Sequence, residues 1–316
     1  MAEKSDKGST VDGALIGARG GKGGPPIPPG GRGEGPSAGE ASKDPAIPKP
    51  PRWLTTLRAE PPAVLGKLLG LGCILFILIV WYLFTAGDSA ADRPISPSKL
   101  PSPGDVFDSF GKLEERGLVD GIIATLVRVL KGFGLAALVG VGFGVLAASF
   151  RAVAAFLNPL VLFGRSLPLA ALIPITILWF GIGEKQKEMF IFIASAPFIF
   201  SDTVKAISLV PERYVETAQT LGASRWQIIY KVLFPLALPD IITGLRFLFG
   251  LALGYIMLAE AINSRAGLGF MINTGERLGL IEQNYLLLII IGILAYLVDW
   301  VLRFMQRYFF YYRKDL

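Results

Sequence analysis

Apolar runs of membrane length recur through most of this chain, and they constrain its fold more than any other feature. The first extends from Leu68 to Ala86, close to the roughly 20 residues that a helix needs to cross a bilayer core. Five more follow: Gly121–Phe150, Phe156–Phe180, Met189–Val210, Leu236–Ala261 and Asn284–Phe304. With 52% hydrophobic residues and a mean hydropathy of +0.53, the chain is too apolar for an ordinary soluble domain. The predicted fold class is therefore an all-α polytopic membrane protein with about six transmembrane helices.

Charges flanking these runs predict their orientation. The formal net charge is +6, and basic residues in a membrane protein more often mark the cytoplasmic side than a nucleic-acid site. Basic residues precede the first run and acidic ones follow it: Arg52, Arg58 and Lys67, then Asp88 and Asp92. The end of the chain is basic and aromatic, with Arg303, Arg307, Arg313 and Lys314. We therefore expect both termini to be cytoplasmic.

The segment from Met1 to Pro62 differs from the rest of the chain. It is dense in Gly, Pro, Ser and charge, so we expect a disordered cytoplasmic tail, with the membrane domain at 63–316. Its glycine run Gly17–Gly24 is not a phosphate-binding loop, because Ile16 and Gly23 stand where Gly and Ser or Thr are needed. With no His and one Cys, the chain offers no His-based catalysis, usual metal site or internal disulfide.

A polar island, Val210–Pro235, interrupts the apolar runs and is predicted to form two short helices around a turn. Pro211 suits a first helical position, and Gly222 suits the left-handed stop of a helix. Ser224 with Gln227 three residues later is a capping-box pattern, which predicts the start of a second helix. That helix should run until Pro235 breaks or bends it.

A helix–turn–helix with a basic second helix also occurs in DNA recognition. Here both ends of the island enter membrane-length apolar runs within a few residues, so the second helix could hardly reach a major groove. We expect no nucleic-acid partner. An ordinary cytoplasmic loop that happens to be helical is the remaining alternative.

The island resembles the EAA loop of binding-protein-dependent ABC importer permeases. The matching positions are Glu216-Thr217-Ala218, Gly222 and Val232-Leu233-Phe234-Pro235, with Thr217, Val232 and Phe234 departing conservatively from the family's Ala, Ile and Leu. Flanking segments resemble the sulfonate/nitrate/taurine/bicarbonate branch of these permeases: Leu167–Lys187, Gly244–Arg246, Ala259-Glu260 and Gly267–Gly269. The resemblance covers roughly Lys99 to the C-terminus.

This resemblance implies a type I ABC importer transmembrane domain in a bacterial-type plasma membrane. The chain would be a transport subunit, not an enzyme, and would bind no cofactor; a partner ATPase would use the ATP. Further implied partners are an extracytoplasmic substrate-binding protein and a second permease copy, identical or related. The implied ATPase-coupling residues are Glu216, Thr217, Ala218, Gly222, Ser224, Val232 and Pro235.

Charged residues inside the apolar runs are costly and are functional candidates by default. We single out Arg165, Asp202, Arg246, Glu260 and Asp299; Arg128 and Lys131 lie in the first half of the second run, which is predicted to be partly buried or interfacial. Arg246 and Glu260 are candidates for the translocation pathway. Fourteen positions apart on one helix, they lie about 21 Å apart, so each should have its own partner. An ion-coupled secondary transporter or channel is the alternative function, although its carboxylates would be scattered.

Small residues repeat every fourth position along the second apolar run, at Ala136, Gly140, Gly144 and Ala148. Such a ridge predicts close approach of helix backbones in lipid.

Overall fold

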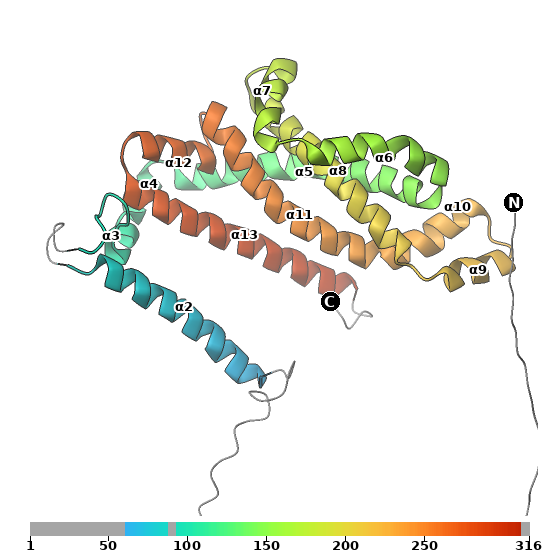
Figure 1. Ribbon diagram of the computed structural model, residues 1–316, viewed down its shortest axis with the longest axis horizontal. Coiled ribbons are helices and arrows are strands. Elements are labelled where there is room, and N and C mark those ends of the chain that lie inside the picture. The colour runs from blue at the N-terminus through green and yellow to red at the C-terminus, as the bar shows by residue number, and fades with distance from the viewer. Residues whose placement is uncertain (1–60, 88–92, 311–316) are drawn as a thin grey trace, which may run out of the picture. The chain divides into compact units, whose positions relative to one another are not determined.

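The computed structural model describes residues 61–87 and 93–310, and all regular elements in that part of the chain are helices (Figure 1). The elements are α2 (Ala63–Thr85), α3 (Pro103–Asp108), α4 (Phe110–Glu115), α5 (Leu118–Ser149), α6 (Arg151–Ser166), α7 (Leu169–Phe180), α8 (Glu184–Ser208), α9 (Glu212–Thr220), α10 (Arg225–Ile228), the π-helical turn η1 (Ile229–Leu233), α11 (Phe234–Asn263), α12 (Leu268–Arg277) and α13 (Ile281–Phe309). The predicted tail falls almost wholly outside the described residues.

The long helices α5, α8 and α11 form the centre of the membrane domain. Their contact surfaces share one apolar cluster that includes Val129, Phe190 and Ile256, all fully buried. The predicted small-residue ridge lies in this contact: a Cβ added at Gly140 would lie 2.8 Å from Ile199, and one at Gly144 would lie 2.7 Å from Thr203. Gly132, one turn before the predicted ridge, extends it against Glu188. The close approach of α5 and α8 is confirmed.

Large apolar side chains cover the outside of several helices, as expected for a protein whose solvent is lipid. No residue in the most apolar stretch of α2 is buried, and Leu71, Phe76 and Ile79 are all exposed. Within residues 61–87 and 93–310, five helices are long and apolar enough to cross a membrane, or six crossings result if α6 and α7 together form one. This agrees with the predicted number of spans.

The predicted span Phe156–Phe180 is wrong as a single helix. Helices α6 and α7 meet at an angle of 107°. Leu167 and Pro168 between them are extended, with ψ angles of 133° and 121°. The residue before a proline is disfavoured in the helical conformation, which explains why the helix ends there. Pro159 and Pro174 lie inside helices without ending them.

The polar stretch between the predicted third and fourth spans, Gly181–Glu188, is only partly a connection. Only Gly181–Gly183 connects the helices, because α8 already begins at Glu184. Gln186 is buried and donates a hydrogen bond to Thr176 Oγ1 of α7 at 2.8 Å. Lys187 is buried as well, with its Nζ 3.3 Å from Glu184 Oε1. The Gln186 bond ties α7 and α8 together, and the Lys187 pair lies within α8.

Candidate functional site

The polar island forms the two-helix element predicted from its sequence, α9 followed by α10 (Figure 1). Helix α9 ends in a left-handed Gly222, with φ of +77°. The Gly222 N–H donates to Gln219 O at 2.9 Å, and the Ala223 N–H donates to Ala218 O at 3.0 Å. These two bonds satisfy carbonyls that the end of a helix otherwise leaves unpaired. Pro211 is the N-cap residue of α9, one position before the first helical residue, where it was expected to lie at the first helical position.

The second helix begins at the predicted capping box. The Ser224 N–H donates to Gln227 Oε1 at 2.8 Å, and the Gln227 N–H donates to Ser224 Oγ at 3.4 Å. Each residue therefore satisfies a backbone donor of the other. Together with the Gly222 turn, this fixes the angle between α9 and α10 through backbone hydrogen bonds.

Of the two outcomes expected at Pro235, a break or a bend, the break does not occur. Helix α10 passes through η1 directly into α11, so Arg225–Asn263 is one continuous 39-residue helix. Pro235 stands in the first turn of α11, directly after the π turn. Its missing N–H removes no regular α-helical bond, because the preceding π turn has already shifted the hydrogen-bond pattern: the Phe234 N–H donates to Ile229 O. The island is therefore a direct extension of a membrane helix.

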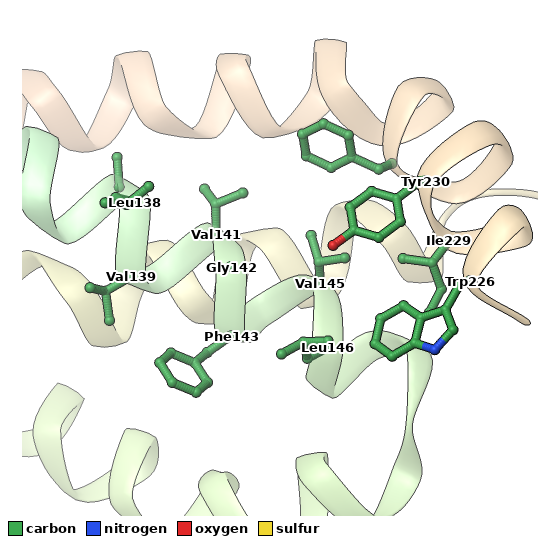
Figure 2. A pocket seen from close by; sticks show the side chains of 12 residues that line it. Leu138, Val139, Val141, Gly142, Phe143, Val145, Leu146, Trp226, Ile229 and Tyr230 are labelled. Atoms are coloured by element: carbon green, nitrogen blue, oxygen red, sulfur yellow. The ribbon is translucent and has the colours of Figure 1, made fainter.

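Aromatic side chains dock this extension against the end of α5. The Trp226 ring lies 5.9 Å from that of Phe150 and 6.2 Å from that of Tyr230, centroid to centroid. Between α5 and the α10–η1 segment lies an apolar groove of about 700 Å³. Figure 2 shows Trp226 and Tyr230 on one side of it and Val141 and Val145 of α5 on the other.

The predicted coupling residues differ in exposure. Glu216, Thr217, Gly222 and Ser224 are exposed, whereas Ala218 and Val232 are half-buried. The Thr217 hydroxyl donates to Arg213 O at 2.7 Å. Glu216 makes no ion pair with any described residue. Its carboxylate is thus available to a partner. Pro235 is exposed on the membrane side of the element.

A buried ion cluster lies at the other end of the bundle, centred on Arg128 of α5. Its Nη1 donates to Glu260 Oε1 of α11 at 2.6 Å, and the same guanidinium pairs with Glu184 at the start of α8. Glu260 is fully buried and also accepts from Thr125 Oγ1 at 2.9 Å and from the Gly269 N–H at 3.0 Å. The cluster therefore ties α5, α8, α11 and the start of α12 together.

Arg246 has a separate set of partners on α13. Its Nη2 lies 3.0 Å from Asp299 Oδ1, and its Nη1 donates to Gln306 Oε1 at 2.6 Å. The expectation that Arg246 and Glu260 each have their own partner is confirmed. Contact of either residue with a transported solute stays a prediction.

Sequence reasoning missed the roles of Arg128 and Glu184. Glu184 lies outside the predicted spans and Arg128 lies in the first half of the second apolar run, so neither is among the candidate site residues. The two lie 56 positions apart and Arg128 and Glu260 lie 132 apart. A lone arginine in a long apolar run was the available signal, but it names no partner.

The chain has a membrane domain of long apolar helices, and a polar two-helix extension lies between the central helices α8 and α11. This is the arrangement of a transport subunit. The chain belongs to the family of binding-protein-dependent transport system inner membrane components, which matches residues 140–310. It is 30% identical over 245 residues to the taurine transport system permease protein TauC of Escherichia coli, covering 76% of this chain and 87% of that one.

Two further relatives support the same branch. The bicarbonate transport system permease protein CmpB of Synechococcus elongatus is 31% identical, covering 77% of this chain and 89% of that one. The nitrate import permease protein NrtB of Synechocystis is 32% identical, covering 74% of this chain and 86% of that one. Among solved structures, an inward-facing form of the MetNI methionine ABC transporter matches with a TM-score of 0.53 and 27% identity, covering 60% of this chain and 94% of that chain.

The chain is therefore the permease subunit of an ABC importer, with the type I transmembrane fold, and a multi-pass inner membrane protein. ATP hydrolysis belongs to a separate subunit. The alternative of an ion-coupled secondary transporter or channel is not favoured. Consistent with this, Glu260 and Asp299 each pair with arginine instead of forming a joint ion site.

Proposed function

We propose that this permease imports a small oxyanion by alternating access. The relatives named above are taurine, bicarbonate and nitrate permeases. Taurine carries a sulfonate, so an oxygen-rich anionic group is common to all three solutes. The three relatives are about equally similar to this chain. They therefore support the class of solute but do not indicate which of the three solutes this permease carries.

The α9–α10 element is the proposed coupling site to the ATPase, and its direct continuity with α11 is the observation that carries this. Helix α9 follows α8 after three residues, and α10 continues into α11. Because α8 and α11 pack against each other in the centre of the bundle, a force applied to the element would reach both. Exposed Glu216 and Thr217 would face the ATPase.

The remaining assignments follow from this role. Cytoplasmic ABC ATPase subunits would bind the element and use ATP, while the permease itself would hold no cofactor. An extracytoplasmic binding protein would deliver the solute, and a second copy or a related permease would complete the translocation pathway. With α6 and α7 counted as one crossing, six crossings would put both termini on the same side as the element, and the flanking basic residues support the cytoplasm as that side.

The experiment exchanges Gly222 for valine and uses Gly279 as a matched control. Both glycines end a helix in the left-handed conformation, with φ of +77° and +69°, and neither has another atom within 4 Å of an added Cβ. The Leu280 N–H also donates to Gly275 O at 2.8 Å, so both turns share the same hydrogen-bond pattern. A β-branched residue costs roughly 1–3 kcal/mol in this conformation, at either position.

Gly222→Val should leave membrane insertion intact, weaken co-purification of the ATPase and abolish ATP-dependent uptake in proteoliposomes. Gly279→Val, with the same local strain at the other end of the bundle, should retain ATPase association. Parental association and uptake in Gly222→Val would refute the coupling assignment and leave an ordinary helical loop as the better interpretation.

A further inference from the structure

Arg128, Arg165 and Arg246 belong to three different helices of the membrane domain, α5, α6 and α11. Arg128 pairs with Glu260, and Arg246 pairs with Asp299. Arg165, in the last turn of α6, has no carboxylate within ion-pair distance among the described residues. Its guanidinium lies over the Phe198 ring, 5.3 Å from the ring centroid. The side chain is exposed, so this positive charge lies against an aromatic face and is not neutralised by any described carboxylate.

Arg165 lines a pocket of about 600 Å³ between α6 and α8. Asn158, seven residues earlier and thus on the same face of α6, lines the same pocket, and Ser201 contributes from α8. The Ser201 hydroxyl donates to Pro197 O at 3.0 Å, so the free hydrogen-bond donors come from α6. Asp202 is turned toward Gly244 of α11, and it does not line the pocket. The pocket therefore presents a guanidinium and an amide without a carboxylate among its lining residues.

The pocket residues Asn158 and Arg165 lie within the predicted third span, Phe156–Phe180. Helix α6 begins at Arg151, next to the docked α10–η1 segment, and Arg165 is about 21 Å further along its axis at 1.5 Å per residue. Asn158 is about half as far along. An uncompensated arginine at this depth is costly in lipid, so such residues face a polar cavity or a functional partner. The volume is within the roughly 300–1,000 Å³ of small-molecule sites.

We propose that Arg165 and Asn158 form an oxyanion-binding site on the translocation pathway. This proposal rests on the proposed import of small oxyanions. The planar guanidinium can donate two parallel hydrogen bonds to a sulfonate, nitrate or bicarbonate group. The Asn158 amide adds a neutral donor on the same face. Phe198 holds the guanidinium in place without cancelling its charge. Selection for an oxygen-rich anion thus occurs within the membrane as well as at the delivery step.

The first test measures uptake by the complete importer, with its ATPase and binding protein, in proteoliposomes supplied with labelled taurine, nitrate or bicarbonate. Arg165→Gln should lower ATP-dependent uptake of the transported anion at least tenfold, mainly through a raised KM. Arg165→Lys keeps the charge but loses the paired donors, and should retain an intermediate rate. Arg151→Gln removes an exposed charge from the first turn of the same helix and should transport at the parental rate. Equal kinetics in parental and Arg165→Gln importers would overturn the proposal.

The second test needs neither transport nor the ATPase. A cysteine replaces Asn158 in a Cys73→Ser background, and the solubilised permease reacts with an anionic sulfonate-bearing methanethiosulfonate or with its cationic trimethylammonium counterpart. Because Arg165 lies about 10 Å along the helix, its charge should favour the anionic reagent about tenfold. Adding Arg165→Gln should abolish this preference, and a cysteine at exposed Ser208 should be unaffected. Free nitrate should slow the anionic reaction only while Arg165 is present.

The two tests separate the two hypotheses. If the parental importer moves none of the three anions, the proposed solute class fails, yet charge-selective labelling would still support an anion site. If uptake is normal but labelling shows no dependence on Arg165 and nitrate gives no protection, the site is wrong while the proposed function stands.

Discussion

Removing Glu260 should cause a large loss of stability, because its carboxylate is the buried acceptor for three donors. Arg128 Nη1, Thr125 Oγ1 and the Gly269 N–H all lie within 3.0 Å of its oxygens, and the side chain is fully buried. Breaking a buried ion pair by removing one partner typically costs about 3–5 kcal/mol. Arg128 keeps its contacts with Glu184 and the Ala266 carbonyl, so we expect the lower end of that range for Glu260→Ala.

The free energy of unfolding should therefore fall by about 3 kcal/mol, or roughly a hundredfold in the folding equilibrium constant. Glu260→Gln should also lower the free energy of unfolding, by about 1–3 kcal/mol. The amide NH₂ group of the glutamine would face a group that now donates a hydrogen bond to the carboxylate, and two donors cannot bond each other. The assay is reversible unfolding of the purified permease in mixed micelles with increasing SDS, followed by circular dichroism.

A double-mutant cycle distinguishes the ion pair from simple loss of packing. The double variant Arg128→Met, Glu260→Met removes both charges and replaces each side chain by one of similar volume. Glu184 loses its arginine partner, but its side chain is 60% exposed and can be solvated. The double variant should be more stable than the sum of the single losses predicts, by at least about 1–2 kcal/mol. A loss under about 1 kcal/mol for Glu260→Ala, together with additive single changes, would refute this account of the cluster.

Three further predictions concern packing, topology and the tail. Gly140→Ala should lower the free energy of unfolding by about 1–3 kcal/mol, since its Cβ would lie 2.8 Å from the Ile199 side chain, whereas Gly142→Ala on the open side should be nearly neutral in the same SDS titration. A cysteine at Ser224, in a Cys73→Ser background, should resist an impermeant thiol reagent applied outside intact cells; labelling from outside would overturn the orientation. Deleting Met1–Lys49 should leave insertion and transport near normal, because that composition cannot build a core, and loss of ATPase binding in the truncated protein would contradict this.

The sequence determined those features that depend on neighbours along the chain. Membrane-length apolar runs predicted the long helices, because in lipid a backbone must satisfy its own hydrogen bonds. The turn at Gly222 and the capping box at Ser224 were predicted from residues within five positions of each other, and the structure confirms both. Local hydrogen bonds and the freedom of glycine are enough to specify such features.

Tertiary structure decided which prolines end a helix and which residues pair. Pro159, Pro168, Pro174 and Pro235 have the same covalent constraint, yet only the segment at Pro168 bends sharply. At the others, the helix continues because neighbouring turns accommodate the missing N–H, as the π turn does before Pro235.

The partners of the buried charges were likewise set by the fold. Arg128 meets Glu260 only because α5 and α11 pack together and α12 returns its Gly269 N–H to the same carboxylate. The sequence requires that a buried charge find a partner, since leaving it unpaired is costly in a medium without water. Which of the distant carboxylates fulfils that requirement is decided by the helices that become neighbours in space.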